Sequence, residues 1–84
     1  MKVILPEHIR ASLRQLDKDT RRLLGVEIRK FQSGQYVNFK KLHYGKDKWR
    51  IAAGDWRIML VSSVENNEKT YTVIDIIARK DAYR

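Results

Sequence analysis

The sequence predicts an α+β fold, in which a helical hairpin packs on one face of an antiparallel β-sheet. Apolar residues recur at helical spacing between residues 7 and 34, and β-branched and aromatic residues dominate the segments after residue 48. Within the second part, Gly54-Asp55 has the residue types of a two-residue hairpin turn. We therefore expect the element order β-α-α-β-β-β in one domain spanning residues 1–84.

The N-terminal half predicts one short strand and two helices. The strand covers Met1–Leu5 and is ended by Pro6, a residue well suited to the start of a helix. The first helix carries an apolar stripe of Ile9, Leu13 and Leu16. Asp17 and Asp19 offer oxygens that can cap a second helix, and Gly34 predicts its end. The apolar stripe of this second helix consists of Leu23, Leu24, Ile28 and Phe31.

A turn at Gly54-Asp55 fixes the register of the central hairpin, because Ala53 must then face Trp56. One face of the hairpin is apolar and holds Trp49, Ile51, Ala53, Trp56, Ile58 and Leu60. The other face holds Lys48, Arg50, Ala52, Arg57 and Met59. The apolar face must pack on the helices, which leaves Arg50 and Arg57 open to solvent as diagonal neighbours about 7–8 Å apart. Because like charges repel, this pair predicts an anion such as phosphate above it.

The remaining segments differ in how clearly they indicate structure. Gln35–Lys46 fits either a short strand or an extended connection, whereas Thr70–Ala78 is rich in β-branched residues and predicts a strand. The second hairpin strand is expected to continue to Ser63, followed by a loop over Val64–Lys69.

In the last strand, Ile74 and Ile76 are expected in the core. Alternation then places Arg79 on the same open side as Arg57. Asp75, also on that side, is expected to hold an arginine in an ion pair rather than to act as a base.

The composition limits the classes of function. With no cysteine, the chain can form neither a disulfide nor a thiolate metal site. The N-terminal apolar run is too short for a signal peptide, and no stretch approaches the length of a membrane span. We therefore expect a soluble cytoplasmic protein without a membrane partner. The net charge is +8, and residues 36–57 hold six Lys or Arg against two acids, which favours binding to a polyanion such as nucleic acid.

Three stretches of the sequence carry a resemblance to a known family. They are Lys41-Leu42, the run W-R-I-x-x-G-D-W-R-I-M-L-V from Trp49 to Val61, and the closing segment Ile76–Arg84 with R-K-D-A-Y-R. Together with the order of elements, they resemble the RelE-like branch of the RelE/ParE toxin superfamily. The resemblance extends over essentially the whole chain.

The resemblance implies an endoribonuclease toxin that cleaves mRNA in the ribosomal A site and works without a metal ion or cofactor. Arg57 corresponds to the arginine that stabilises charge at the scissile phosphate, and Arg79 to a basic residue after the last strand. Tyr83 corresponds to a tyrosine that orients or stacks on the substrate, and Arg50 stands where some members have a catalytic lysine. This chain departs from those members at Ala52, where they have a second lysine.

The departure raises the question of which residue acts as the base. Cleavage by a 2′-hydroxyl needs a proton acceptor, and arginine is a poor one because its guanidinium stays protonated. The chain has two histidines, His8 and His43, and only His43 lies in the basic segment, where it is the candidate acid or base. Lys46 and Lys48 are further candidates if neighbouring cations lower their pKa values. Candidate phosphate-binding residues are Lys40, Lys41, Lys46, Lys48, Lys80 and Arg84.

Three functions remain open from the sequence. The first is the nuclease, with mRNA and the 70S ribosome as partners and an acidic, partly disordered antitoxin that folds on binding. The second is a ParE-like inhibitor of DNA gyrase without catalysis. The third is a basic RNA- or ribosome-binding module that binds without cutting.

Overall fold

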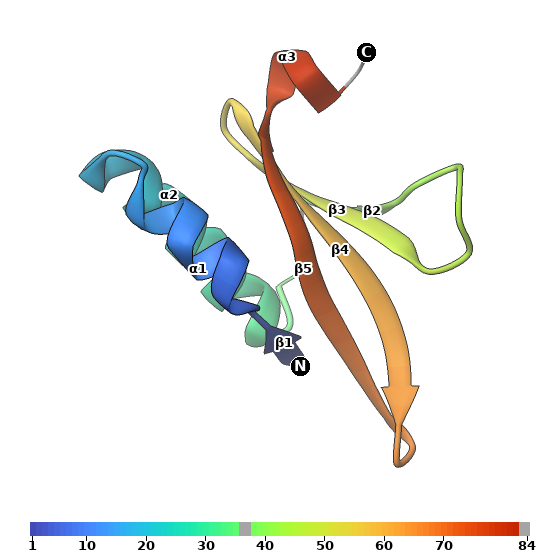
Figure 1. The fold of residues 1–84 in the computed structure, drawn as a ribbon. Helices are drawn as coiled ribbons and strands as arrows, with labels where there is room; N and C mark the ends of the chain where they lie inside the picture. Colours follow the sequence, from blue (N-terminus) through green and yellow to red (C-terminus); the bar gives the residue numbers. More distant parts are fainter. Residues whose placement is uncertain (36–37, 83–84) are drawn as a thin grey trace.

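The computed structural model describes residues 1–35 and 38–82 and consists of a sheet covered on one face by two helices (Figure 1). The elements are β1 (Lys2–Ile4), α1 (Glu7–Arg14), α2 (Lys18–Gln32), β2 (Phe39–Lys41), β3 (Lys48–Ala53), β4 (Trp56–Glu65), β5 (Glu68–Ala78) and α3 (Arg79–Ala82). The predicted α+β class with its helical hairpin is confirmed. No helix among the described residues is both long and apolar enough to span a membrane.

The sheet has five strands in the order β1-β5-β4-β3-β2. Neighbouring strands are antiparallel except for β1, which pairs with β5 in parallel, with Val3 opposite Tyr71. The prediction was an antiparallel sheet with the N-terminal strand at an edge or beside the last strand; β1 does lie at the edge beside β5, but it is parallel to β5. Strands β1 and β5 are parallel because the segment between them, which includes both helices, returns the chain to the end of the sheet where β1 begins.

The helices begin and end where the sequence indicates. Pro6 directly precedes α1, and Asp17 caps α2, accepting a hydrogen bond from the Thr20 backbone N–H at 3.2 Å. The Thr20 hydroxyl and backbone N–H together hold the pKa of Asp17 below its usual value. Helix α2 ends at Gln32, and Gly34 follows with a φ of 94°, a conformation that glycine adopts readily.

The core lies between the helices and the apolar face of the β3–β4 hairpin. The register of this hairpin is the predicted one, from Ala53 opposite Trp56 to Trp49 opposite Leu60. Gly54 has a φ of +59°, as the first residue of a mirror-type turn requires. The buried apolar residues are Ile9, Leu24, Ile28, Phe31, Ile51, Ala53, Ile58, Leu60, Tyr71 and Val73.

The segments around this hairpin differ in extent from the prediction. The ambiguous Gln35–Lys46 segment contains the edge strand β2. Strands β4 and β5 run past the expected limits and leave only Asn66 and Asn67 as a turn between them, with φ values of 51° and 63°. Asparagine tolerates positive φ better than most residues, so two of them can close a tight hairpin where a longer loop over Val64–Lys69 was expected.

A β-bulge in β5 changes which of its residues face the helices. Met59 pairs with Asp75 whereas Leu60 pairs with Val73, so Ile74 is an extra residue in β5. Val73 is fully buried and Ile76 packs against the core, but Ile74 is 40% exposed. The prediction that Ile74 lies in the core is therefore wrong.

Candidate functional site

The face of the sheet that points away from the helices, called the outer face below, carries a row of paired polar side chains. Lys40 of β2 pairs with Arg50 of β3, Arg50 with Met59 of β4, and Met59 with Asp75 of β5. Directly paired residues project to the same side of a sheet. Two cations, a methionine and an acid therefore follow one another across four strands.

The β2 end of this row opens into a cavity of about 300 Å³, called the loop-end cavity. It is lined by Lys40, Lys41, Leu42, His43, Tyr44, Arg50 and Met59. His43 and Lys40 are exposed, and Arg50 is half-buried. The cavity thus combines an imidazole side chain with cations that can bind phosphate. His43 and Arg50, both candidate site residues from the sequence, line the same cavity.

Arg57 belongs to the same face but to a different environment. Arg57 is two residues before Met59 in β4, closer to the β3–β4 turn. It pairs with Ala52 of β3 and Ile77 of β5. Its Nη1 donates hydrogen bonds to the carbonyl oxygens of Gly54 at 2.9 Å and Trp56 at 2.8 Å. Only 7% of the residue is exposed, so the expectation that Arg57 is open to solvent is wrong. The guanidinium folds back onto its own turn.

Arg79 approaches the same turn from β5. Its backbone N–H donates to the Asp55 carbonyl oxygen at 2.6 Å, at the point where β5 passes into α3. Figure 1 shows α3 beside the tip of the β3–β4 hairpin. Asp55, Ala78, Arg79 and Lys80 line a hollow of about 440 Å³ there, called the turn-end hollow. Arg57 and Arg79 therefore both donate hydrogen bonds to carbonyl oxygens at the β3–β4 turn, Arg57 through its side chain and Arg79 through its backbone N–H.

The other predicted contact residues are distributed over both faces. Lys41 pairs with Trp49 and lies over its indole ring at 5.8 Å, so it projects to the helix side, opposite to Lys40. Lys48 is half-buried at the start of β3, and Lys46 is exposed in the connection before it. Tyr83 and Arg84 lie outside the described residues.

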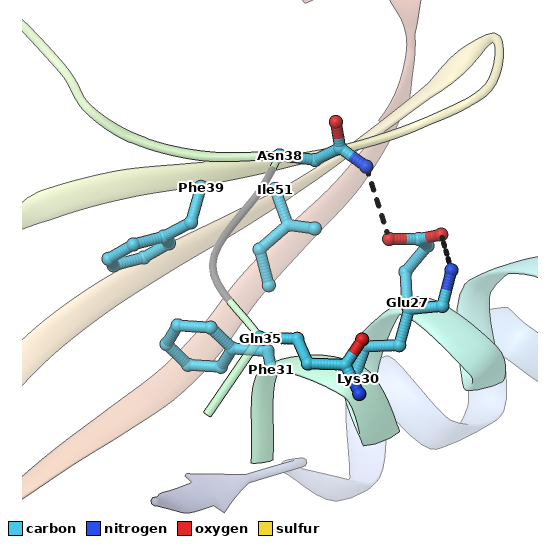
Figure 2. Close-up of a pocket in the computed structure, with 7 residues that line it drawn as sticks. All are labelled: Glu27, Lys30, Phe31, Gln35, Asn38, Phe39 and Ile51. Carbon is cyan, nitrogen blue, oxygen red and sulfur yellow. Dashed lines mark hydrogen bonds and ion pairs between the residues drawn. The ribbon is translucent and has the colours of Figure 1, made fainter. Parts of the chain in front are cut away.

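A third opening lies under the edge strand β2 and is lined by different kinds of residue (Figure 2). Its volume is about 150 Å³, and Phe31 and Phe39 line one side of it. The Glu27 carboxylate accepts from the Asn38 amide at 3.5 Å and pairs with the Lys30 amine at 3.5 Å. This small cavity holds a carboxylate, so it does not suit an anionic substrate.

Leu42 and Tyr44, which were not among the predicted site residues, line the loop-end cavity beside His43. Tyr44 is 62% exposed, which is unusual for so large a side chain. In the sequence, both residues stand between the basic Lys40 and Lys48, and Leu42 also belongs to the Lys41-Leu42 motif of the resemblance.

The order and arrangement of the elements give this chain the fold seen in two solved RelE–RelB complexes. It resembles a chain of the RelB–RelE antitoxin–toxin complex from Methanococcus jannaschii, with a TM-score of 0.65, 17% identity, and 95% and 94% of the two chains covered. It also resembles a chain of the archaeal RelE–RelB complex from Pyrococcus horikoshii OT3, with a TM-score of 0.66, 22% identity, and 93% of each chain covered. No protein-family profile and no curated protein matches the sequence.

Proposed function

We propose that this chain is the toxin of a type II toxin–antitoxin pair and that it cleaves mRNA as an endoribonuclease. The observation that carries the proposal is the loop-end cavity, where His43 shares one opening with Arg50 and Lys40 on a RelE-like fold. Cleavage by a 2′-hydroxyl needs a proton acceptor for that hydroxyl and cations beside the phosphate, and this cavity provides both.

In the proposed reaction, His43 takes the proton of a ribose 2′-hydroxyl, and the oxygen attacks the adjacent phosphorus. The O2′–P bond forms, the P–O5′ bond breaks, and the departing 5′ oxygen takes a proton from solvent. The products are a 2′,3′-cyclic phosphate and a 5′-hydroxyl end. Arg50 and Lys40 bind the phosphate oxygens, whose negative charge grows in the transition state.

Arg57 has a supporting role in this proposal. Its guanidinium donates to two carbonyl oxygens of the turn, so the positive charge is fixed beneath the outer face without occupying the cavity. A charge that is already oriented need not reorganise during the reaction, which makes it more effective than a mobile one. Arg79 and Lys80, around the turn-end hollow, extend the positive surface along which an RNA strand would bind.

The proposed partner in the resting state is an acidic, partly disordered antitoxin. The two similar structures are a RelB–RelE antitoxin–toxin complex and a RelE–RelB complex, and a chain of net charge +8 is a suitable partner for an acidic segment. The ribosomal A site is the proposed place of cleavage, with 70S ribosomes supplying the mRNA in a cytoplasmic setting.

The test incubates the purified chain with translating 70S ribosomes and, separately, with the same mRNA alone, and maps the new RNA ends. Fragments with 2′,3′-cyclic phosphate ends in the ribosome sample support the proposal. The fragments must disappear in Arg50→Ala and persist in Arg22→Ala, an exposed arginine on α2.

Two other outcomes would favour the alternatives. Intact RNA together with trapped gyrase–DNA breaks would indicate a ParE-like inhibitor. Intact RNA with the chain bound to ribosomes would indicate a binding module without catalysis.

A further inference from the structure

The β5 bulge creates a second hollow beside the loop-end cavity, and no role has been assigned to it. Because Ile74 is an extra residue between Val73 and Asp75, the strand presents two consecutive residues, Ile74 and Asp75, opposite Met59. Val73 and Ile76 on either side of them face the core. The bulge therefore places an apolar and an acidic side chain together on the outer face.

These two residues line a hollow of about 300 Å³, called the bulge hollow. Its lining is mainly apolar and includes Leu42, Tyr44, Met59 and Ile77 beside Ile74 and Asp75. Leu42, Tyr44 and Met59 line the loop-end cavity as well, so the two openings adjoin. An apolar hollow next to a cationic cavity matches the two ends of a nucleotide, whose base is flat and apolar on its faces and whose phosphate is anionic.

The spacing along the cross-strand row fits a single nucleotide. Arg50 and Asp75 are two strands apart, which corresponds to about 10 Å at the usual strand separation. A nucleotide whose phosphate binds Arg50 can thus extend over Met59 and bring the edge of its base to Asp75.

The carboxylate of Asp75 is held in place by its own strand. Its Oδ1 accepts the backbone N–H of Ile76 at 2.9 Å, and Asp75 forms no ion pair with any residue in the described ranges, contrary to the expectation that it would hold an arginine. An ionised carboxylate only accepts hydrogen bonds. It therefore favours a base edge that donates.

We propose that the bulge hollow binds one base of the RNA substrate and that Asp75 selects a base with an exocyclic amino group. Cytosine, adenine and guanine each carry such a donor, whereas uracil presents carbonyl oxygens on both sides of its single N–H. Those oxygens would lie against the carboxylate and repel it. The inference rests on the proposed RNA substrate, and Asp75 is a specificity-determining residue in it, not a catalytic one.

The sharpest comparison is between cytosine and uracil, which have the same size; cytosine has an amino group at C4 and an accepting N3, whereas uracil has an oxygen at C4 and an N3–H. The experiment titrates the full chain with two 2′-O-methyl pentanucleotides that differ only in this base and cannot be cleaved. Binding is followed by the fluorescence anisotropy of a dye attached to the 5′ end of each oligonucleotide, because the indole of Trp49 lies on the helix side of the sheet. Wild-type binding is expected to be roughly tenfold tighter for the cytosine oligonucleotide.

Two substitutions separate the roles of the hollow. Asp75→Asn offers a donor as well as an acceptor, so the two affinities should come within about twofold of each other. Ile74→Ser should weaken both oligonucleotides about equally, because it removes apolar surface that any base covers. Val64→Ser, at another exposed aliphatic residue on the same pair of strands, is the matched control and should change neither affinity.

The pocket assignment is overturned if Asp75→Asn retains the preference for cytosine, or if Ile74→Ser binds as tightly as Val64→Ser. This outcome is distinct from a failure of the proposed function. A chain that shows the Asp75-dependent preference but cuts no RNA would keep the base pocket and lose the nuclease. A chain that cuts RNA without any such preference would keep the nuclease and lose the pocket.

Discussion

The two ends of the outer face hold their cations in opposite ways. At the turn end, Arg57 is buried and donates to two backbone carbonyl oxygens within its own hairpin. At the loop end, Lys40 and His43 are exposed and Arg50 is half-buried around a cavity of about 300 Å³. One end provides a fixed positive charge and the other provides side chains that can meet a substrate.

The difference shows that strand register determines the face of a residue but not the direction in which a long side chain extends. Arg50 and Arg57 are on the same face, two positions apart in register, yet it is Arg57 that donates to the carbonyl oxygens of Gly54 and Trp56 at the turn. An arginine beside a turn can donate hydrogen bonds to the carbonyl oxygens of that turn. An arginine in mid-strand, such as Arg50, is surrounded by backbone groups that are paired within the sheet. Substitutions at the two ends should therefore have different consequences.

The largest effect is expected at the loop end, for His43→Gln. If His43 takes the proton in the proposed cleavage, its loss should lower the rate of RNA cleavage by roughly 10² to 10⁴, with the fold intact because the residue is exposed. His8→Gln, on the exposed surface of α1, is the matched control and should cleave normally. Equal rates for the two variants would remove His43 from the mechanism.

Arg50→Ala should follow, with a loss of about 10² to 10³ in the cleavage rate, comparable to removing one preorganised donor to a transition state. Its midpoint of urea unfolding should stay close to that of the wild type. Arg50→Lys keeps the charge but loses the planar fork, so partial recovery of the rate is expected. A loss of stability that matches the loss of activity would mean that Arg50, like Arg57, mainly supports the fold.

The sequence was sufficient to predict the central hairpin, since a two-residue turn at Gly54-Asp55 leaves only one register, and the structure has that register. The helices were predictable because Asp17 and Gly34 mark their limits with specific backbone requirements. Both cases rest on interactions between residues close together in the chain.

The bulge in β5 could not be predicted, because the strand is apolar on both faces. Tyr71 and Val73 alternate with Thr72 and Ile74, and either set could face the helices. No glycine or proline in the strand marks the irregularity. The conformation of the Arg57 side chain could not be predicted either, because it depends on carbonyl groups whose orientation is defined only in the folded turn.

At the turn end, the expected effect of Arg57→Ala is on stability first. The guanidinium is nearly fully buried and donates two hydrogen bonds, so its removal should lower the free energy of unfolding by about 2–3 kcal/mol. Urea unfolding followed by tryptophan fluorescence measures the change. Arg50→Ala, measured in the same way, is the comparison across the outer face and should lose less than about 1 kcal/mol.

The smallest effect we predict concerns the two glycines with positive φ that flank β3, Gly45 at the loop end and Gly54 at the turn end. Alanine at φ values of +82° and +59° should cost about 1–2 kcal/mol at either position. The neighbours differ, however. A Cβ at Gly54 would lie 3.1 Å from Cδ2 of Leu23 in α2, whereas one at Gly45 would lie 2.8 Å from Cγ of Lys48.

Double-mutant cycles can distinguish these two contacts. Combining Gly54→Ala with Leu23→Ala should recover part of the loss in unfolding free energy, because the methyl group then meets no side chain of the helix. Combining Gly45→Ala with Lys48→Ala should recover less, since the long lysine stem can already move aside in the single variant. Equal recovery at both ends would mean that the turn end is no more tightly packed than the loop end, and the contrast between a fixed and an adaptable end of the outer face would not hold.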